Sequence, residues 1–114
     1  MKFSGMIAAA VLLLFPSLGQ AASKADIEKG KELAYDSNKG NCLACHMVGD
    51  GEFPGNFGPP MFQMKERYPE RAALYEQLWD ASAKNPKSMM PPFGKNGVLT
   101  EKEVNQIVDY LYTL

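Results

Sequence analysis

The sequence predicts an all-α fold, and three observations support this prediction. Apolar residues recur at helical spacing near both ends of the chain and again over residues 69–82. No alternating apolar and polar run is long enough to predict a strand. The ten glycines and eight prolines fall mainly between residues 40 and 97. We therefore expect one small helical domain whose loop-rich middle is held by a covalent or metal-based link.

The first segment of the chain has the pattern of an export signal. Lys2 gives a positive start, residues 6–15 form an unbroken apolar run, and small residues precede position 22. The run is shorter than the roughly 20 residues that a membrane-spanning helix needs. We expect a signal peptide over residues 1–21, a single domain over residues 22–114, no membrane anchor in the mature form and a periplasmic location. An uncleaved anchor is the alternative.

The first helix of the mature domain is expected to start at Ser23, a residue type that caps helix N-termini. Ile27, Gly30 and Ala34 then lie on one face. Because a glycine inside a helix costs about 1 kcal/mol relative to alanine, we expect close packing of Gly30 against another element to offset that cost.

A second long helix is expected in the middle of the chain. Pro69 suits a first-turn position, and the apolar pattern continues to about Ser82. The residues expected to face inward are Ala72, Tyr75, Leu78 and Trp79.

The C-terminal segment carries the clearest helix pattern. Thr100 and Glu103 have the spacing of a capping box, and Leu99 and Val104 flank it as a hydrophobic staple. An apolar stripe at positions i, i+3, i+4 and i+7 follows, formed by Val104, Ile107, Val108 and Leu111.

Composition excludes several classes of protein. Twelve Lys and Arg against thirteen Asp and Glu give a net charge of −1, which argues against nucleic-acid binding. The hydrophobic share of 46% excludes a disordered or collagen-like chain. Two cysteines are too few for a miniprotein held together by disulfides.

Cys42, Cys45 and His46 form the sequence C-x-x-C-H, which attaches c-type haem. Two thiols at this spacing can form thioethers with the two vinyl groups on one porphyrin edge, and the next residue can then bind the iron. A redox-active C-x-x-C normally opens a helix after a strand, and no strand is predicted here. Structural zinc needs four ligands, and a simple disulfide leaves His46 without a role. We therefore predict one covalently bound haem c.

The iron needs a second axial ligand if its sixth position is not to stay open. We favour Met90 over Met89, because Met90 directly precedes paired prolines that hold the backbone extended. The alternative is that both methionines only pack. Met61 and Met64 lie closer to His46 in the chain and are expected to belong to the core.

Further contacts to the haem or to His46 are expected from three kinds of residue. A backbone carbonyl of the Gly-Pro-Pro segment, at Pro59, is placed to accept the other imidazole N–H of His46, with a merely rigid loop as the alternative. Trp79 is a candidate donor to a haem propionate, and ordinary core packing is an equal alternative. Arg67 and Arg71 could pair with a propionate, although solvent exposure is the simpler expectation.

Together these features resemble class I cytochromes c, in which three to four helices wrap one haem. In that family a helix glycine packs against an aromatic residue of the last helix, which implies that Gly30 contacts Tyr110. Several short matches further resemble the SoxX subunits of thiosulfate-oxidising SoxAX cytochromes, and Met61 departs from the aliphatic residue usual there. The segments that carry this resemblance are 40–46, 54–60, 68–71, 78–80 and 85–100.

The resemblance implies a role in sulfur oxidation. SoxAX joins thiosulfate oxidatively to a cysteine of the SoxYZ carrier, with release of two electrons. The reactive haem of that family lies in SoxA beside a cysteine ligand, and this chain has no cysteine beyond Cys42 and Cys45. It would thus be no enzyme alone, but a subunit of an L-cysteine S-thiosulfotransferase that accepts electrons from a SoxA-like cytochrome and passes them to a small c-type cytochrome.

Two other functions stay open from the sequence. A free-standing electron-carrier cytochrome c of a respiratory or photosynthetic chain would share the fold and the haem and differ in its partner. A thiol–disulfide oxidoreductase would instead use Cys42 and Cys45 without haem.

Overall fold

The computed structural model describes residues 21–114, so the predicted signal peptide of residues 1–21 lies outside the described residues except for Ala21. Within residues 21–114 there is no β-strand, and the only strand-like pairing is an isolated parallel bridge between Val48 and Met61. The predicted all-α fold is therefore confirmed. The helices are α1 (Lys24–Tyr35), α2 (Met64–Arg67), α3 (Arg71–Trp79) and α4 (Glu101–Leu111), with short 3-10 turns η1 (Cys42–Ala44) and η2 (Ala81–Ala83).

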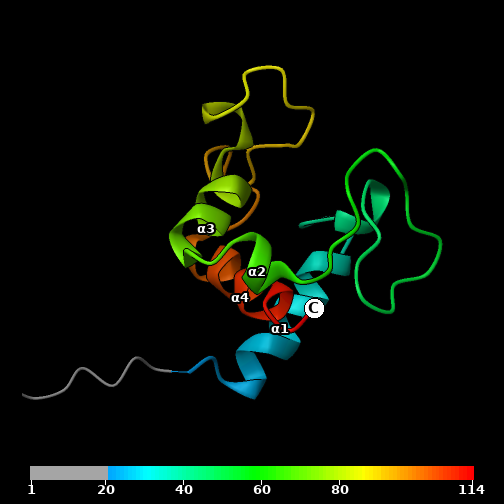
Figure 1. Ribbon diagram of the computed structural model, residues 1–114, viewed down its shortest axis with the longest axis vertical. Helices are drawn as coiled ribbons and strands as arrows, with labels where there is room; N and C mark the ends of the chain where they lie inside the picture. The colour runs from blue at the N-terminus through cyan, green and yellow to red at the C-terminus, as the bar shows by residue number, and fades with distance from the viewer. Residues whose placement is uncertain (1–20) are drawn as a thin grey trace, which may run out of the picture.

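The two terminal helices pack against each other, and two long loop segments extend from the helical body. Figure 1 shows α1 and α4 side by side, the teal-to-green loop of residues 45–60 on one side, and the yellow loop of residues 82–92 on another. No helix between residues 21 and 114 is both long enough and apolar enough to cross a membrane.

Helix α1 begins where the sequence predicts. The Ser23 side chain accepts a hydrogen bond of 3.1 Å from the Asp26 N–H, which satisfies one of the free donors of the first turn. Gly30 and Ala34 are buried, as expected for the inner face. Leu33 is buried beside them although the sequence analysis did not single it out.

Helix α4 has the predicted capping box. The Glu103 N–H donates to Thr100 Oγ1 at 3.2 Å, and the Thr100 N–H donates to Glu103 Oε2 at 2.8 Å. Leu99 and Val104 are both buried at the start of the helix, as a hydrophobic staple requires. The predicted apolar stripe of α4 is buried along its length.

The middle helix is shorter than predicted. It starts at Arg71 rather than Pro69 and ends at Trp79 rather than near Ser82. It ends there because Asp80 leaves the helical conformation, with φ −155°, and its side chain accepts from the Ser82 N–H at 3.1 Å. That local contact turns the chain into η2, as short polar side chains commonly do at helix ends.

The inner face of α3 also differs from the prediction. Ala72 is exposed, whereas Leu74, which was not predicted, is buried together with Leu78. Tyr75 and Trp79 are half-buried. The buried face of α3 is therefore formed by Leu74 and Leu78, one turn apart, and is rotated about the helix axis from the predicted face.

Both core methionines expected from the sequence belong to the core. Met64 is buried, and Met61 packs against the buried cluster from a half-buried position. This cluster joins α1, α3 and α4 around the following buried side chains: Leu33, Leu74, Leu78, Leu99, Val104, Ile107, Val108 and Leu111.

Gly30 lies at the point where α1 crosses α4. A Cβ atom at this position would overlap the carbonyl oxygen of Gln106 and would lie 3.0 Å from the Cβ of Tyr110. The Gln106 side chain also donates to Asp26 at 2.8 Å. The expected packing of Gly30 against Tyr110 is confirmed, and the two helices touch backbone to backbone because Gly30 has no side chain.

Replacing Gly30 tests this crossing. In Gly30→Ala, helix propensity would add about 1 kcal/mol of stability, but the overlap with Gln106 costs about 3 kcal/mol. We expect a net loss of about 2 kcal/mol in the free energy of unfolding, measured by denaturant titration. Ala25→Gly, at an exposed position of the same helix, isolates the propensity effect. A Gly30→Ala protein more stable than the wild type would contradict the close crossing.

Candidate haem site

The haem-attachment sequence lies in a tight turn that follows α1 after a short loop of residues 36–41. Asn41 takes a left-handed conformation, with φ 48°, and leads into η1. The N–H of His46 donates to the Cys42 carbonyl at 2.9 Å, so one turn separates the first cysteine from the histidine. Both thiols are free, with Cys42 buried and Cys45 exposed. The turn therefore presents two sulfurs and one imidazole from five consecutive residues.

The burial of Cys42 does not fit a thiol–disulfide oxidoreductase. Such enzymes depend on a lowered pKa that makes the attacking cysteine a thiolate. Here burial raises the pKa of the Cys42 thiol to about 11. The turn also follows a helix and a loop rather than a strand. The Cys42 thiol is thus disfavoured as the thiolate that such an enzyme needs.

The His46 ring is held in one orientation by backbone groups. Its Nδ1 lies 2.7 Å from the Pro59 carbonyl oxygen. Because a carbonyl can only accept, Nδ1 carries the proton and Nε2 keeps its lone pair. A Cβ atom on Gly58 would overlap the imidazole, so the backbone at Gly58 lies directly against the ring. The Gly58 N–H donates to the Cys45 carbonyl at 2.7 Å. Nε2 is thereby the ring nitrogen available to a metal.

The loop that carries Pro59 is tied to the haem-attachment turn by main-chain hydrogen bonds. The Gly55 N–H donates to the Leu43 carbonyl at 2.8 Å, and the Met61 N–H donates to the Met47 carbonyl at 2.8 Å. A Cβ atom on Gly55 would overlap the Ala44 carbonyl. The loop needs a glycine there because its backbone lies in contact with the turn.

A tyrosine pair fixes the chain just beyond His46. The Tyr35 hydroxyl lies 2.9 Å from the Val48 carbonyl, 3.0 Å from the Asp50 carboxylate and 2.9 Å from the Tyr110 hydroxyl. Since Tyr35 has one proton and two acceptors to share it with, Tyr110 is the donor between the two tyrosines. Lys31 pairs with Asp50 at 2.7 Å. We call Tyr35, Tyr110 and Asp50 the tyrosine clamp; no sequence pattern pointed to it.

The predicted axial methionine lies on a loop beside α3. Met89 is 82% exposed, whereas Met90 is half-buried and packs against the core. The Met90 N–H donates to Ser88 Oγ at 3.2 Å, and Gln77 Nε2 lies 3.8 Å from the Met90 sulfur. The two methionines therefore differ clearly in environment.

Trp79 connects α3 to the loop that follows Met90. Its ring stacks on Tyr75 with 5.8 Å between ring centroids, and its carbonyl accepts from the N–H groups of Gly94 and Lys95, both at 3.2 Å. A Cβ atom on Gly94 would overlap the indole. The contacts of the Trp79 ring are therefore packing contacts, as in the alternative of ordinary core packing.

The two arginines considered for a propionate are exposed and already contact protein groups. Arg67 donates to the Pro60 carbonyl at 2.8 Å, and Arg71 pairs with Asp109 at 2.6 Å.

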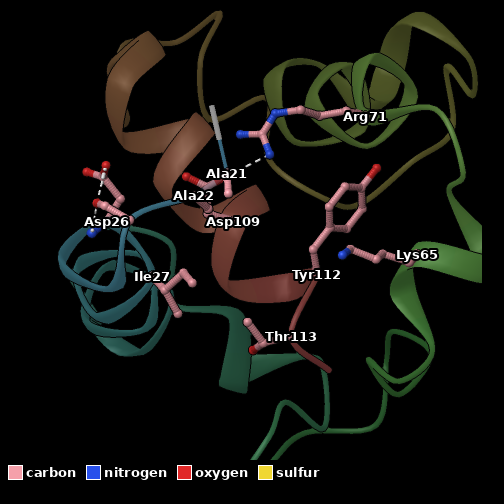
Figure 2. Close-up of a pocket in the computed structure, with 10 residues that line it drawn as sticks. Ala21, Ala22, Asp26, Ile27, Lys65, Arg71, Asp109, Tyr112 and Thr113 are labelled. Atoms are coloured by element: carbon pink, nitrogen blue, oxygen red, sulfur yellow. Dashed lines mark hydrogen bonds and ion pairs between the residues drawn. The ribbon is translucent and has the colours of Figure 1, made fainter. Parts of the chain in front are cut away.

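A pocket of about 760 Å³ lies away from the haem-attachment turn, between the start of α1 and the end of α4. Figure 2 shows Asp26 and Ile27 on one side of it and Lys65, Arg71 and Tyr112 on the other. None of the residues that line it belongs to the attachment turn or to the methionine loop.

The donor set fits haem better than a bare metal ion. Among residues 21–114, no three His, Cys, Asp or Glu side chains converge as a protein-only metal site requires. A single imidazole nitrogen suits an iron that is held mainly by a porphyrin. The two free thiols beside His46 suit covalent attachment of that porphyrin.

Fold and site together define a class I cytochrome c, an electron-transfer protein whose cofactor is haem c. A family model described as cytochrome c oxidase, cbb3-type, subunit III matches residues 25–111. The chain belongs to this cytochrome family.

Two of three similar proteins agree with this assignment. The crystal structure of SoxXA from P. pantotrophus matches with a TM-score of 0.67 and 27% identity, over 75% of this chain and 79% of that one, so the chain is a SoxX-like cytochrome. Cytochrome c6 of Thermostichus vulcanus is 29% identical over 107 residues, covering 92% of this chain and 85% of that protein. An uncharacterized lipoprotein of Aquifex aeolicus (strain VF5) is 37% identical over 78 residues, which are 67% of this chain; the chain spans 37% of that protein's length.

The tyrosine clamp predicts a specific pH dependence. Burial and the hydrogen bond to Tyr35 raise the pKa of Tyr110 in the folded protein. Its contribution to stability is thus fully present below about pH 10 and declines above it, where the unfolded chain ionises first. Tyr110→Phe should cost about 1 kcal/mol at pH 7 and flatten this decline. Denaturant unfolding between pH 7 and pH 11 measures both effects.

Tyr68→Phe is the matched control, because Tyr68 is a half-buried tyrosine outside the clamp. An equal decline in the free energy of unfolding above pH 10 in the wild type and in Tyr110→Phe would show that Tyr110 does not cause this pH dependence.

Proposed function

We propose that this protein is the monohaem electron-transfer subunit of a SoxAX-like complex. It would act in the periplasm after removal of residues 1–21. The observation that carries the electron-transfer role is the hydrogen bond between His46 Nδ1 and the Pro59 carbonyl, which leaves Nε2 free to bind iron. The complex would conjugate thiosulfate oxidatively to a cysteine of a SoxYZ carrier.

Four side chains would hold the haem. Cys42 and Cys45 would form the two thioethers, and His46 Nε2 and the Met90 sulfur would bind the iron. The bound group supplies an iron that alternates between the ferric and ferrous states. A soft thioether ligand favours ferrous iron and so raises the reduction potential. The burial of Met90 and the exposure of Met89 support Met90 as the ligand.

The chain's other contributions are orientation and charge. Pro59 fixes the tautomer and rotation of His46, and Gly58 leaves room for the ring. The Trp79 indole N–H would donate to a haem propionate, and the stack on Tyr75 would keep the indole in place.

The electrons would arrive from a SoxA-like cytochrome. Conjugation of a thiol with thiosulfate releases two electrons, and one haem accepts them one at a time. The chain has no thiol other than Cys42 and Cys45, so the cysteine-ligated reactive haem would belong to the partner. A small c-type cytochrome would be the final acceptor.

An exposed apolar surface supports a stable protein partner. We call Met47, Phe53, Phe57 and Phe62 the apolar loop surface; they lie between His46 and α2 and are 57%, 96%, 80% and 53% exposed. Aromatic residues dominate interface energetics, and exposed apolar patches mark interaction sites. The same loop carries the carbonyl that holds His46, so a partner bound there would lie beside the haem.

A free-standing soluble carrier is the second candidate function. The similarity to cytochrome c6, which extends over 92% of this chain, favours it. The two candidates predict the same haem and differ in whether a larger cytochrome stays bound.

The ligand proposal is tested by replacing each methionine separately in the haem-loaded protein. Met90→Ala should abolish the sulfur-to-iron charge-transfer band and lower the reduction potential, because a strong soft ligand is lost. Met89→Ala, at the exposed neighbouring position, is the matched control and should leave both unchanged. Loss of the band in Met89→Ala instead would move the ligand by one residue.

The partner proposal is tested by co-expression with the SoxA-like cytochrome of the same organism. We expect a stable complex, and a Phe53→Ser, Phe57→Ser double variant should bind at least about thirtyfold more weakly, since one lost aromatic anchor costs about 2 kcal/mol. Val98→Ser, an exposed apolar residue elsewhere, should bind normally. A monomeric wild-type cytochrome in this mixture would favour the free-standing carrier.

A further inference from the structure

Phe53 combines almost complete exposure with a backbone conformation that disfavours it. Its side chain is 96% exposed, and its φ is 52°, in the left-handed region where a bulky residue is rare. The next residue is Pro54, whose ring further restricts the preceding residue to extended conformations. Because the ring lies in solvent, its burial does not offset this cost within the chain.

Two glycines hold the chain on either side of Phe53. A Cβ atom on Gly51 would overlap the Leu43 side chain, and a Cβ atom on Gly55 would overlap the Ala44 carbonyl. The Gly55 N–H also donates to the Leu43 carbonyl at 2.8 Å. The chain is thus fixed to the attachment turn at both ends of a three-residue span, which has to reverse between them. Strain at Phe53 persists because these contacts determine the path of the backbone.

The charge beside Phe53 is acidic. Residues 47–64 include two acids, Asp50 and Glu52, and no lysine or arginine. Asp50 pairs with Lys31 at 2.7 Å, whereas Glu52 is exposed and forms no ion pair with another described residue. A second copy that met this surface with its own would bring acid against acid. The complementary partner is therefore one whose apolar pocket is bordered by lysine or arginine.

We propose that Phe53 is a pre-organised docking anchor, whose ring fills an apolar pocket with a basic border on the SoxA-like cytochrome. This inference rests on the proposed function, because it specifies one contact within the proposed complex. The strained backbone already holds the ring outward in the free protein. Association then requires no rearrangement of the loop, so less conformational freedom is lost on binding. The contact with the partner accounts for a residue that weakens the free protein.

The strain is tested by unfolding haem-loaded variants in denaturant. Phe53→Ala and Phe53→Gly both remove the exposed ring, but only glycine adopts a positive φ without a steric cost. The folding equilibrium constant should therefore be about fivefold higher in Phe53→Gly than in Phe53→Ala, the equivalent of about 1 kcal/mol. Phe57 is the matched control, because it is 80% exposed and has no positive φ. At that position the glycine variant should be the less stable one, since glycine makes the unfolded chain more flexible.

The anchor is tested by binding of the same variants to the SoxA-like cytochrome of the same organism. Phe53→Ala and Phe53→Gly should both bind about thirtyfold more weakly than the wild type, the equivalent of about 2 kcal/mol for one aromatic anchor. Phe57→Ala should weaken binding less than about fivefold, because Phe57 lies outside the strained span.

The basic border of the pocket is tested by reversing the charge of Glu52. Glu52→Lys should bind more weakly than the wild type at low salt, and the difference should shrink at high salt. Glu28→Lys, at an exposed position of α1, makes the same change in net charge and should bind like the wild type. Equal binding of Glu52→Lys and the wild type at low salt would overturn the basic border.

These measurements separate failure of this inference from failure of the proposed function. If the wild type forms no complex with the SoxA-like cytochrome, the proposed function and the anchor both fall. If the complex forms and Phe53→Ala binds as tightly as the wild type, only the anchor is overturned. If Phe53→Gly is no more stable than Phe53→Ala, no strain holds the ring outward, and the pre-organisation of Phe53 is overturned even where its loss weakens binding.

Discussion

The backbone contact between α1 and α4 at Gly30 is the constraint on which the rest of the structure depends. Because no side chain separates the helices there, Tyr110 comes close enough to hydrogen-bond Tyr35. That tyrosine pair in turn holds the Val48 carbonyl, two residues beyond the histidine of the attachment turn. The missing Cβ atom of Gly30 on α1 is thus linked through packing and hydrogen bonds to the position of His46, the proposed iron ligand.

The site itself is assembled almost entirely from main-chain contacts. The loop after the attachment turn folds back through hydrogen bonds from Gly55 and Gly58 and presents the Pro59 carbonyl to His46. Its glycines are needed because the backbone lies against a carbonyl at one position and against the imidazole at another. The imidazole is therefore oriented by main-chain groups of the chain itself.

Local patterns predicted the parts of the molecule that local interactions determine. The capping residues of α1 and α4 were recognisable because each contact spans three residues. The contacts that escaped prediction join parts of the chain that are distant in sequence. Tyr35 and Tyr110 are 75 residues apart, and Gln77 of α3 contacts Met90, which lies 13 residues further on. The end of α3 was misplaced because the apolar pattern continues past Trp79, whereas the Asp80 side chain accepts from the Ser82 N–H and turns the chain there.

Because main-chain groups orient His46, the side chains of the same loop are not needed for that task. Apart from the glycines and the proline, the side chains of this loop point outward and take no part in orienting the imidazole; Phe53 and Phe57 are almost fully solvent-accessible. Substitutions at such positions can accumulate without altering the redox centre. A cytochrome built this way can acquire new binding specificity while its electronic properties stay constant.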